Sequence, residues 1–181
     1  MQYKFCVHLT DKDYLDYNVF WSLKSPYGKK QILQLRAMIA GMFALLSLLV
    51  LFKEDFSSAG FIKIIPLVVL LVLSQLLLNW SFSRSLKGTL KTMKRQGKMG
   101  YSPDSEMEFF EDRFVETTPE EKTERNYSSI ERISVIGDKT IYIHMNNVLA
   151  CILPRSCFDS KENYEEFLQF IKTKCQKVDI Y

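Results

Sequence analysis

Two long uncharged apolar runs constrain the fold of this chain more than any other feature of its sequence. Residues 37–52 form a run of 16, and residues 64–83 form a run of 20. At about 1.5 Å per residue, these runs make helices of roughly 24 and 30 Å, against a bilayer core of about 30 Å. The flanking Arg36 and Lys53 can reach the headgroups and lengthen the shorter run. The sequence therefore predicts a transmembrane hairpin over residues 37–83, with spans 37–52 and 64–83; the alternative is two buried helices in a soluble core.

Lysine and arginine are concentrated outside the two ends of this hairpin. Ten of the twelve basic residues around the spans precede the first span or follow the second, and the connecting loop has only Lys53 and Lys63. Basic flanks mark the cytoplasmic side of a membrane. We therefore expect both termini in the cytoplasm and the loop outside. The first apolar run starts too far from the N-terminus for a cleavable signal peptide, so we expect an uncleaved anchor.

The charge distribution indicates lipid contact more than nucleic-acid binding. Residues 81–100 have six basic residues and no acidic residue, whereas residues 101–181 have ten basic and sixteen acidic residues. A basic segment beside a span suits anionic lipid, and we expect no nucleic-acid partner. The four cysteines show no CxxC spacing and lie on the predicted cytoplasmic side, where thiols stay reduced.

Residues 1–36 are expected to form an N-terminal strand and a juxtamembrane helix. Alternating apolar residues over 2–9 predict a half-buried strand that pairs with the C-terminal sheet. Thr10 and Asp13 then provide a helix start, and Ser25-Pro26 provide a second one. The aromatic-rich residues 14–21 suit either the membrane interface or packing on the soluble domain.

The spans contain small and polar residues with packing roles. Ala37, Gly41 and Ala44 form a small-residue face, which permits close approach of the second span or of another copy in a homo-oligomer. Gln75 is placed to hydrogen-bond across the hairpin. Neither span contains an ionisable residue, which argues against a pump or carrier.

Residues 84–100 predict a basic amphipathic helix that continues the second span. Its apolar stripe is Leu86, Leu90 and Met93. We expect lipid-headgroup contacts from its cations, and the alternative is a plain topology signal. The candidate cations are Arg84, Lys87, Lys91, Lys94, Arg95 and Lys98.

Residues 101–181 are expected to form a small cytoplasmic domain of the α+β class. Its sequence predicts an antiparallel meander of about five strands, with residues 119–126 as a polar separator and tight turns at Gly137-Asp138 and Asn146-Asn147. A two-residue turn at Asn146-Asn147 would place Ile141, Ile143, Val148, Ala150 and Ile152 on one face and Tyr142, His144, Leu149 and Cys151 on the other. A C-terminal helix starting at Asp159 or Ser160 closes the sheet, with an apolar stripe of Tyr164, Phe167, Leu168, Ile171 and Cys175.

The C-terminal segment resembles the YcxB-like family of bacterial membrane proteins. In that family an aromatic-x-x-I-x-x-I strand precedes a hairpin, and an apolar run ends in Pro-basic-x-x-Phe before an acidic helix. The corresponding residues here are Tyr127, Ile130, Ile133, Pro154, Arg155 and Phe158, with Tyr127 in place of the usual Trp. The resemblance implies a two-span protein of the bacterial cell membrane with a pleckstrin-homology-like cytoplasmic domain. It carries no established activity, and its motif residues are packing residues.

Chemistry-bearing motifs are weak in this sequence. Cys6 and His8 share a strand face, and His144 and Cys151 would be diagonal neighbours, but metal spacing motifs are absent. No phosphate-binding loop, nucleophile elbow or HExxH motif occurs. We therefore expect no enzyme, catalytic residue, metal or cofactor. The favoured function is a membrane-anchored binding or sensor module for a peptide, lipid headgroup or protein; the alternative is an accessory or structural subunit of a larger, transporter-type membrane complex.

Overall fold

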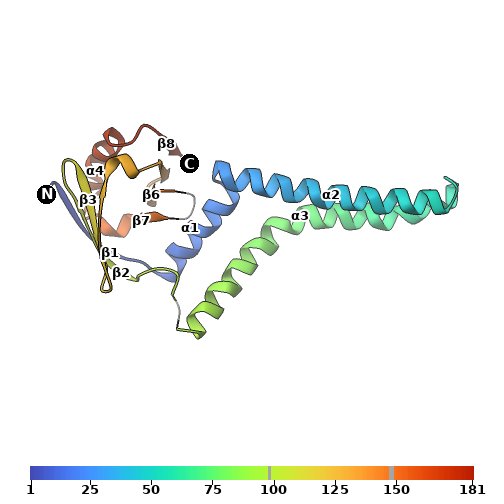
Figure 1. The fold of residues 1–181 in the computed structure, drawn as a ribbon, viewed down its shortest axis with the longest axis horizontal. Helices are drawn as coiled ribbons and strands as arrows, with labels where there is room; N and C mark the ends of the chain where they lie inside the picture. Colours follow the sequence, from blue (N-terminus) through green and yellow to red (C-terminus); the bar gives the residue numbers. More distant parts are fainter. Residues whose placement is uncertain (98, 147–148) are drawn as a thin grey trace. The chain divides into compact units, whose positions relative to one another are not determined.

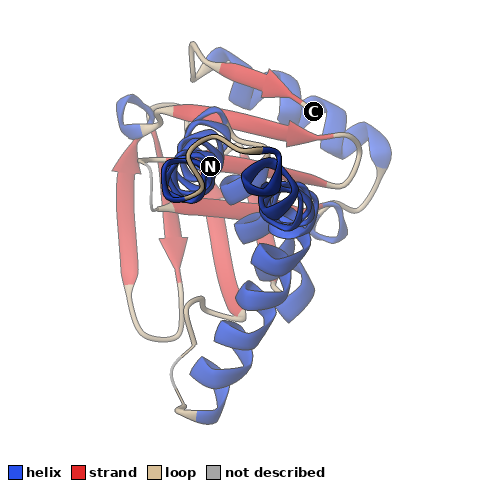
Figure 2. Cartoon of the chain, turned by 90° about the vertical axis from the view of Figure 1, so that its right-hand side faces the viewer, coloured by secondary structure: helices blue, strands red, loops and turns tan. Residues whose placement is uncertain are grey.

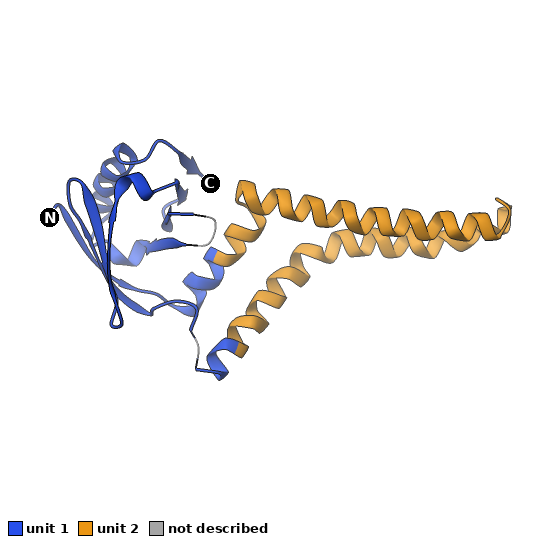
Figure 3. Cartoon of the chain, viewed as in Figure 1, with its two compact units in different colours: residues 1–17, 93–181 blue, residues 18–92 orange. Residues whose placement is uncertain are grey.

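The computed structural model describes residues 1–97, 99–146 and 149–181 as an α+β protein (Figure 1). The chain divides into two compact units (Figure 3). Residues 18–92 form the helical unit, and residues 1–17 with 93–181 form the sheet unit. The sheet unit is therefore built from both ends of the chain, and the helical unit is an insertion between them.

The helical unit consists mainly of two long apolar helices, α2 (Pro26–Lys53) and α3 (Ser58–Arg95). As predicted, α2 starts at Ser25-Pro26, where the Ser25 hydroxyl accepts a hydrogen bond from the Gly28 amide at 2.9 Å. With 28 and 38 residues, the helices extend about 42 and 57 Å, longer than the predicted spans. The most apolar stretch of each helix contains no buried residue. Because core helices of soluble proteins are buried, this exposure favours membrane spans over the soluble alternative.

Polar contacts join α2 and α3 within the helical unit. The Gln75 amide nitrogen lies 3.5 Å from the Arg36 carbonyl oxygen, so the predicted hydrogen bond across the hairpin is confirmed, although it is long. The Arg36 guanidinium also donates to the Asn79 side-chain oxygen at 3.4 Å. At the other end of the helix pair, Lys63 and Glu54 form an ion pair of 2.7 Å.

The first sheet of the sheet unit has the strand order β1-β2-β3-β4, and all its neighbours are antiparallel. The strands are β1 (Tyr3–His8), β2 (Asp104–Phe109), β3 (Arg113–Thr117) and β4 (Lys122–Asn126). The predicted pairing of the N-terminal strand is confirmed, since β1 pairs with β2 and Phe5 lies opposite Met107. The prediction of a polar separator over residues 119–126 is wrong, because β4 lies there. A charged strand is stable at a sheet edge, where its outward side chains remain in water.

The second sheet has the order β7-β6-β5-β8 (Figure 2). Strands β5 (Arg132–Ile136), β6 (Thr140–His144) and β7 (Ala150–Pro154) are antiparallel, and β8 (Val178–Ile180) runs parallel to β5. The prediction of one meander of about five strands is therefore wrong, because the described residues form two sheets of four strands each. As predicted, a tight turn at Gly137, whose φ is +47°, joins β5 to β6.

The predicted faces of the β6–β7 hairpin are also wrong. Ile143 lies opposite Cys151 and His144 lies opposite Ala150, whereas a two-residue turn would shift this register by one. The Met145 amide donates to the Leu149 carbonyl at 3.0 Å, so the connection is longer than the predicted turn. A slip of one residue moves every side chain of a strand to the other face. Asn147 and Val148, which the prediction also used, lie outside the described residues.

Helix α4 (Lys161–Thr173) covers the core of the sheet unit. The Ser160 hydroxyl caps it by accepting from the Asn163 amide at 3.1 Å, which is one of the two predicted starts. The predicted stripe is buried at Tyr164, Phe167 and Ile171. Around the Phe167 ring, the rings of Tyr3, Phe5, Phe109, Phe158 and Phe170 have centroids 4.8–6.2 Å away. The strand from the N-terminus and the helix near the C-terminus thus share one aromatic core.

Helix α1 (Asp11–Leu23) begins in the sheet unit. The Thr10 hydroxyl accepts from the Asp13 amide at 3.2 Å, and the Asp13 carboxylate accepts from the Thr10 amide at 3.0 Å, which confirms the predicted helix start. The Tyr17 ring lies 5.1 Å from the Tyr142 ring and 6.0 Å from the His144 ring. For Tyr17, the structure therefore supports packing on the domain over a place at the membrane interface.

Candidate functional site

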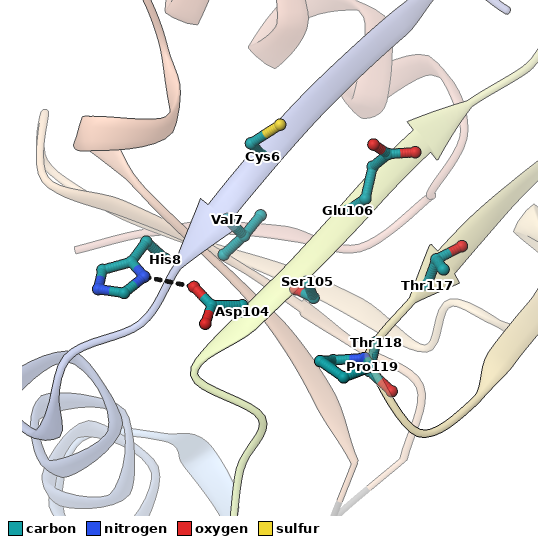
Figure 4. Close-up of a pocket in the computed structure, with 9 residues that line it drawn as sticks. All are labelled: Cys6, Val7, His8, Asp104, Ser105, Glu106, Thr117, Thr118 and Pro119. Atoms are coloured by element: carbon teal, nitrogen blue, oxygen red, sulfur yellow. Dashed lines mark hydrogen bonds and ion pairs between the residues drawn. The ribbon is translucent and has the colours of Figure 1, made fainter.

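A groove of about 410 Å³ lies on the first sheet, where β1, β2 and β3 are neighbours (Figure 4). Strand register assembles it, because His8 lies opposite Asp104 and Cys6 lies opposite Glu106. The residues that line it are Cys6, Val7, His8, Asp104, Ser105, Glu106, Thr117, Thr118 and Pro119.

Two side-chain contacts join β1 to β2 at this groove. The His8 Nδ1 atom lies 2.5 Å from an Asp104 carboxylate oxygen, and the Lys4 ammonium lies 2.7 Å from a Glu106 carboxylate oxygen. The His8 and Asp104 side chains are 75% and 68% exposed, so their contact adds little to stability. The Cys6 thiol extends away from the His8 ring (Figure 4). The arrangement offers hydrogen-bond donors and acceptors on an open surface, which suits recognition of a polar ligand.

Only part of this groove was predictable from the sequence. Alternation placed Cys6 and His8 on one outward face, but nothing indicated that Asp104 and Glu106 lie opposite them. His8 and Asp104 are 96 residues apart in the chain, and no local pattern reports a pairing over that distance.

The cationic candidates on α3 differ in their surroundings. Arg84, Lys87, Lys91 and Arg95 are exposed. The Arg84 guanidinium also lies 5.4 Å from the centre of the Trp80 ring. Lys94 instead forms an ion pair with Asp11, and Lys98 lies outside the described residues.

The apolar stripe of this helix does not face open solvent. Leu90 is buried, and Leu86 and Met93 are half-buried. The headgroup contacts of this helix stay a prediction, and Arg84, Lys87, Lys91 and Arg95 are the candidate cations that are not paired with Asp11.

The two Cys–His pairs that the sequence analysis considered as metal ligands do not come together in the structure. Cys6 and His8 lie on the first sheet, His144 and Cys151 lie on the second, and Cys151 points to the opposite face of its sheet from His144. Among the described residues, no three His, Cys, Asp or Glu side chains gather as ligands of a metal ion. The buried Cys151 thiol instead donates to the Glu116 carboxylate at 3.7 Å. Burial raises the pKa of both groups, so this thiol stays protonated at neutral pH.

The residues of the family motif lie in or against the core. The Tyr127 hydroxyl donates to the Phe110 carbonyl at 2.7 Å, and the Arg155 guanidinium donates to the Phe158 carbonyl at 3.0 Å. The Phe158 ring lies 4.7 Å from the Phe5 ring, which belongs to β1. Ile130, Ile133 and Pro154 are buried.

Comparison with known proteins gives one match. Residues 109–171 match the family model of YcxB-like proteins, from the end of β2 to a point inside α4. Neither the curated proteins nor the solved structures include a significant match to this chain. Residues 109–171 are therefore a YcxB-like domain, which confirms the family resemblance of the motif from Tyr127 to Phe158.

Proposed function

We propose that this chain is a membrane-anchored binding module whose sheet unit lies in the cytoplasm. The observation that carries the proposal is that the most apolar stretches of α2 and α3 contain no buried residue. An exposed apolar surface of that extent needs lipid or protein around it. The basic residues on both outer flanks support an orientation with both termini inside a bacterial cell membrane.

We further propose that the sheet unit is pleckstrin-homology-like. In support, four antiparallel strands are followed by three more and then by a closing helix, α4. The helical unit is inserted between β1 and β2, which are neighbours in one sheet. The short parallel strand β8 is an additional element beside β5.

The groove beside His8 is the proposed ligand surface of the module. Its carboxylates, its imidazole and its threonine hydroxyls suit an extended polar ligand such as a peptide segment of a partner protein. We propose no catalytic step there. The exposed cations Arg84, Lys87, Lys91 and Arg95 are the proposed contacts to anionic headgroups.

The orientation is tested by labelling cysteines in intact cells. In a background with the four native cysteines replaced, Ser57→Cys is expected to react with a membrane-impermeant maleimide and Gln2→Cys is not. After the cells are opened, Gln2→Cys should react as well. Labelling of Gln2→Cys in intact cells would contradict the proposed topology.

A second candidate function is an accessory subunit of a larger membrane complex. Ala37, Gly41 and Ala44 favour it, because all three are exposed and a Cβ atom at Gly41 would meet nothing within 4 Å. Such a face can receive a helix of another chain or of a second copy. Gly41→Leu should abolish capture of a partner by this hairpin face, whereas Thr117→Arg should abolish capture by the groove. The variant that loses the partner identifies the function.

A further inference from the structure

The C-terminal tail, residues 177–181, lies along one edge of the second sheet. Its strand β8 has three residues and runs parallel to β5, with Val178 opposite Ile133 and Ile180 opposite Val135. Every other strand pair among the described residues is antiparallel. The tail is thus a short addition at the end of an otherwise antiparallel sheet.

Three backbone hydrogen bonds join the tail to β5 and to the turn that follows it. The Ile133 amide donates to the Lys177 carbonyl at 2.9 Å, and the Gly137 amide donates to the Tyr181 carbonyl at 3.1 Å. The Tyr181 amide donates to the Val135 carbonyl at 2.9 Å. A peptide that adds itself to a sheet edge binds in the same way, with its backbone giving affinity and alternate side chains giving specificity.

The side chains at the end of the tail are less buried than those of the neighbouring strand β5. Ile180 is 70% exposed and Tyr181 is 39% exposed, while Val178 is half-buried beside the core. Segments with exposed backbone bonds and few buried apolar contacts open at a small fraction of the global unfolding free energy. The tail is therefore held more weakly than β5, β6 or β7.

Arg132 is incompletely satisfied while the tail is in place. Its side chain is only 11% exposed, and its Nε atom lies 3.4 Å from an Asp179 carboxylate oxygen. Within the described part of the chain, the buried Nε and Nη1 atoms of Arg132 make no hydrogen bond. A bidentate guanidinium–carboxylate pair has two bonds of about 2.7–2.9 Å. An acidic residue placed better than Asp179 would satisfy this buried cation more fully.

We propose that the edge of β5 is a binding site for an extended segment of a partner protein, and that the tail is its built-in competitor. The ligand pairs parallel to β5 and has an apolar–acidic–apolar pattern, with its acidic residue facing Arg132. Charge complementarity at Arg132 and the weak seating of the tail support this occupant. The site lies on the second sheet, so it is separate from the groove proposed above on the first sheet.

Amide hydrogen exchange on the full chain in detergent micelles tests whether the tail opens. The amides of Ile133 and Gly137 bond to the tail, whereas the Glu131 amide bonds to the His144 carbonyl at 2.8 Å. We expect Ile133 and Gly137 to exchange about 100-fold faster than Glu131, because opening the tail leaves the rest of the sheet intact. Equal, slow exchange at all three amides would make the tail a permanent strand and overturn the proposal.

Peptide binding tests whether the opened edge accepts a ligand. The probe is a fluorescent peptide with the sequence of residues 176–181, and the control peptide carries Lys in place of its Asp. We expect a chain ending at residue 176 to bind the probe about tenfold more tightly than the full chain, because its internal competitor is gone. Equal binding of probe and control, or no binding by a chain that still unfolds cooperatively, would overturn the proposal.

Two further measurements keep the test decisive. Asp179→Lys in the full chain weakens the tail without shortening it, so it should also bind the probe more tightly than the wild type does. Unchanged binding by this variant would overturn the proposal even if the shortened chain fails to fold. Light scattering identifies the occupant, since a dimer that the shortened chain cannot form would assign the edge to a second copy instead of a partner protein.

Discussion

The Lys94 ammonium lies 2.5 Å from the Asp11 carboxylate, although the two residues are 83 positions apart in the chain. Lys94 belongs to the last turn of α3, and Asp11 belongs to the first turn of α1. The Tyr101 hydroxyl donates to the other Asp11 oxygen at 2.6 Å, and the Tyr14 and Tyr101 rings stack 4.7 Å apart. The hydrogen bond from Lys94, and to a smaller extent that from Tyr101, lowers the pKa of Asp11. This clasp, formed by Asp11, Tyr14, Lys94 and Tyr101, ties the segment that enters β2 to the start of α1.

Asp11→Asn should loosen the clasp, because it removes the charge that both Lys94 and Tyr101 contact. We expect chymotrypsin to cleave after Tyr101 a few times faster in this variant than in the wild type. The double variant Asp11→Lys with Lys94→Asp should restore slow cleavage by reversing the ion pair. High salt should bring the cleavage rate of the wild type closer to that of Asp11→Asn, because salt screens an exposed ion pair. Identical cleavage of all three proteins at low salt would show that the ion pair does not hold this segment.

Gly100→Ala should destabilise the sheet unit by about 1 kcal/mol, because the end of the Tyr14 side chain must move to admit the new methyl group. A Cβ atom at Gly100 would lie 2.5 Å from the Tyr14 hydroxyl and 3.1 Å from the ring carbon that bears it, so the tyrosine must shift. Tyr14→Phe in the same chain should recover part of the loss. Gly88→Ala is the matched control, because a Cβ atom there meets nothing within 4 Å and alanine favours a helix. The measurement is thermal unfolding in micelles, and equal unfolding temperatures for Gly100→Ala and Gly88→Ala would contradict the contact.

Stability should fall as the pH drops from about 6.5 to about 4, in part because of His144. Burial, followed by the positive charge of Arg132, lowers the pKa of His144 from 6.5 to about 4. The unfolded chain therefore binds a proton over this range while the folded chain does not, so protonation favours unfolding. The linked loss is at most about 3 kcal/mol, and it is absent above pH 7. Urea unfolding of wild type and His144→Gln at pH 7 and pH 4.5 checks this, since the carboxylates titrate alike in both proteins. An equal pH dependence of the two proteins would remove His144 as a cause.

Neutralising the exposed cations of α3 should weaken lipid contact without preventing insertion. Each Lys or Arg near an anionic surface contributes about 1 kcal/mol, so Arg84, Lys87, Lys91 and Arg95 changed together to Gln lose several kcal/mol of attraction. We expect faster chymotryptic cleavage near Tyr101 in vesicles with anionic lipid and no change in vesicles of neutral lipid. Lys94→Gln alone is the control, because it breaks the ion pair with Asp11 and keeps the four cations that are proposed to contact lipid. If anionic lipid protects wild type and the fourfold variant equally, these residues act only as a topology signal.

The sequence predicted correctly those elements whose pattern lies within a short stretch of the chain. The alternation of β1, the Ser25-Pro26 start of α2 and the apolar stripe of α4 are each encoded within fewer than about 20 residues, the range over which periodicity carries information. The family motif could be read for the same reason, since Tyr127, Ile130 and Ile133 lie close together in the chain. The structure adds that these residues pack in one core with β1.

Features that depend on distant partners could not be read from the sequence. The charged residues 122–126 resemble a loop unless the neighbouring strand β3 is known, and β8 is too short to show any periodicity. The groove needs the register of β1 on β2, which is fixed by core packing and not by either segment alone. The β6–β7 faces were predicted wrongly because one additional turn residue reverses them.

The insertion of the helical unit between β1 and β2 has a consequence for biosynthesis. Lys4 and Glu108 are partners across these strands although they are 104 positions apart in the chain, so β1 leaves the ribosome long before its neighbour is made. At about 5–20 residues per second, this strand waits roughly 5–20 s while the two long helices are synthesised. During that interval its apolar face is open to chaperones and proteases. The first sheet can therefore be completed only after both long helices have been synthesised, and a chain that stops before β2 keeps an unpaired N-terminal strand.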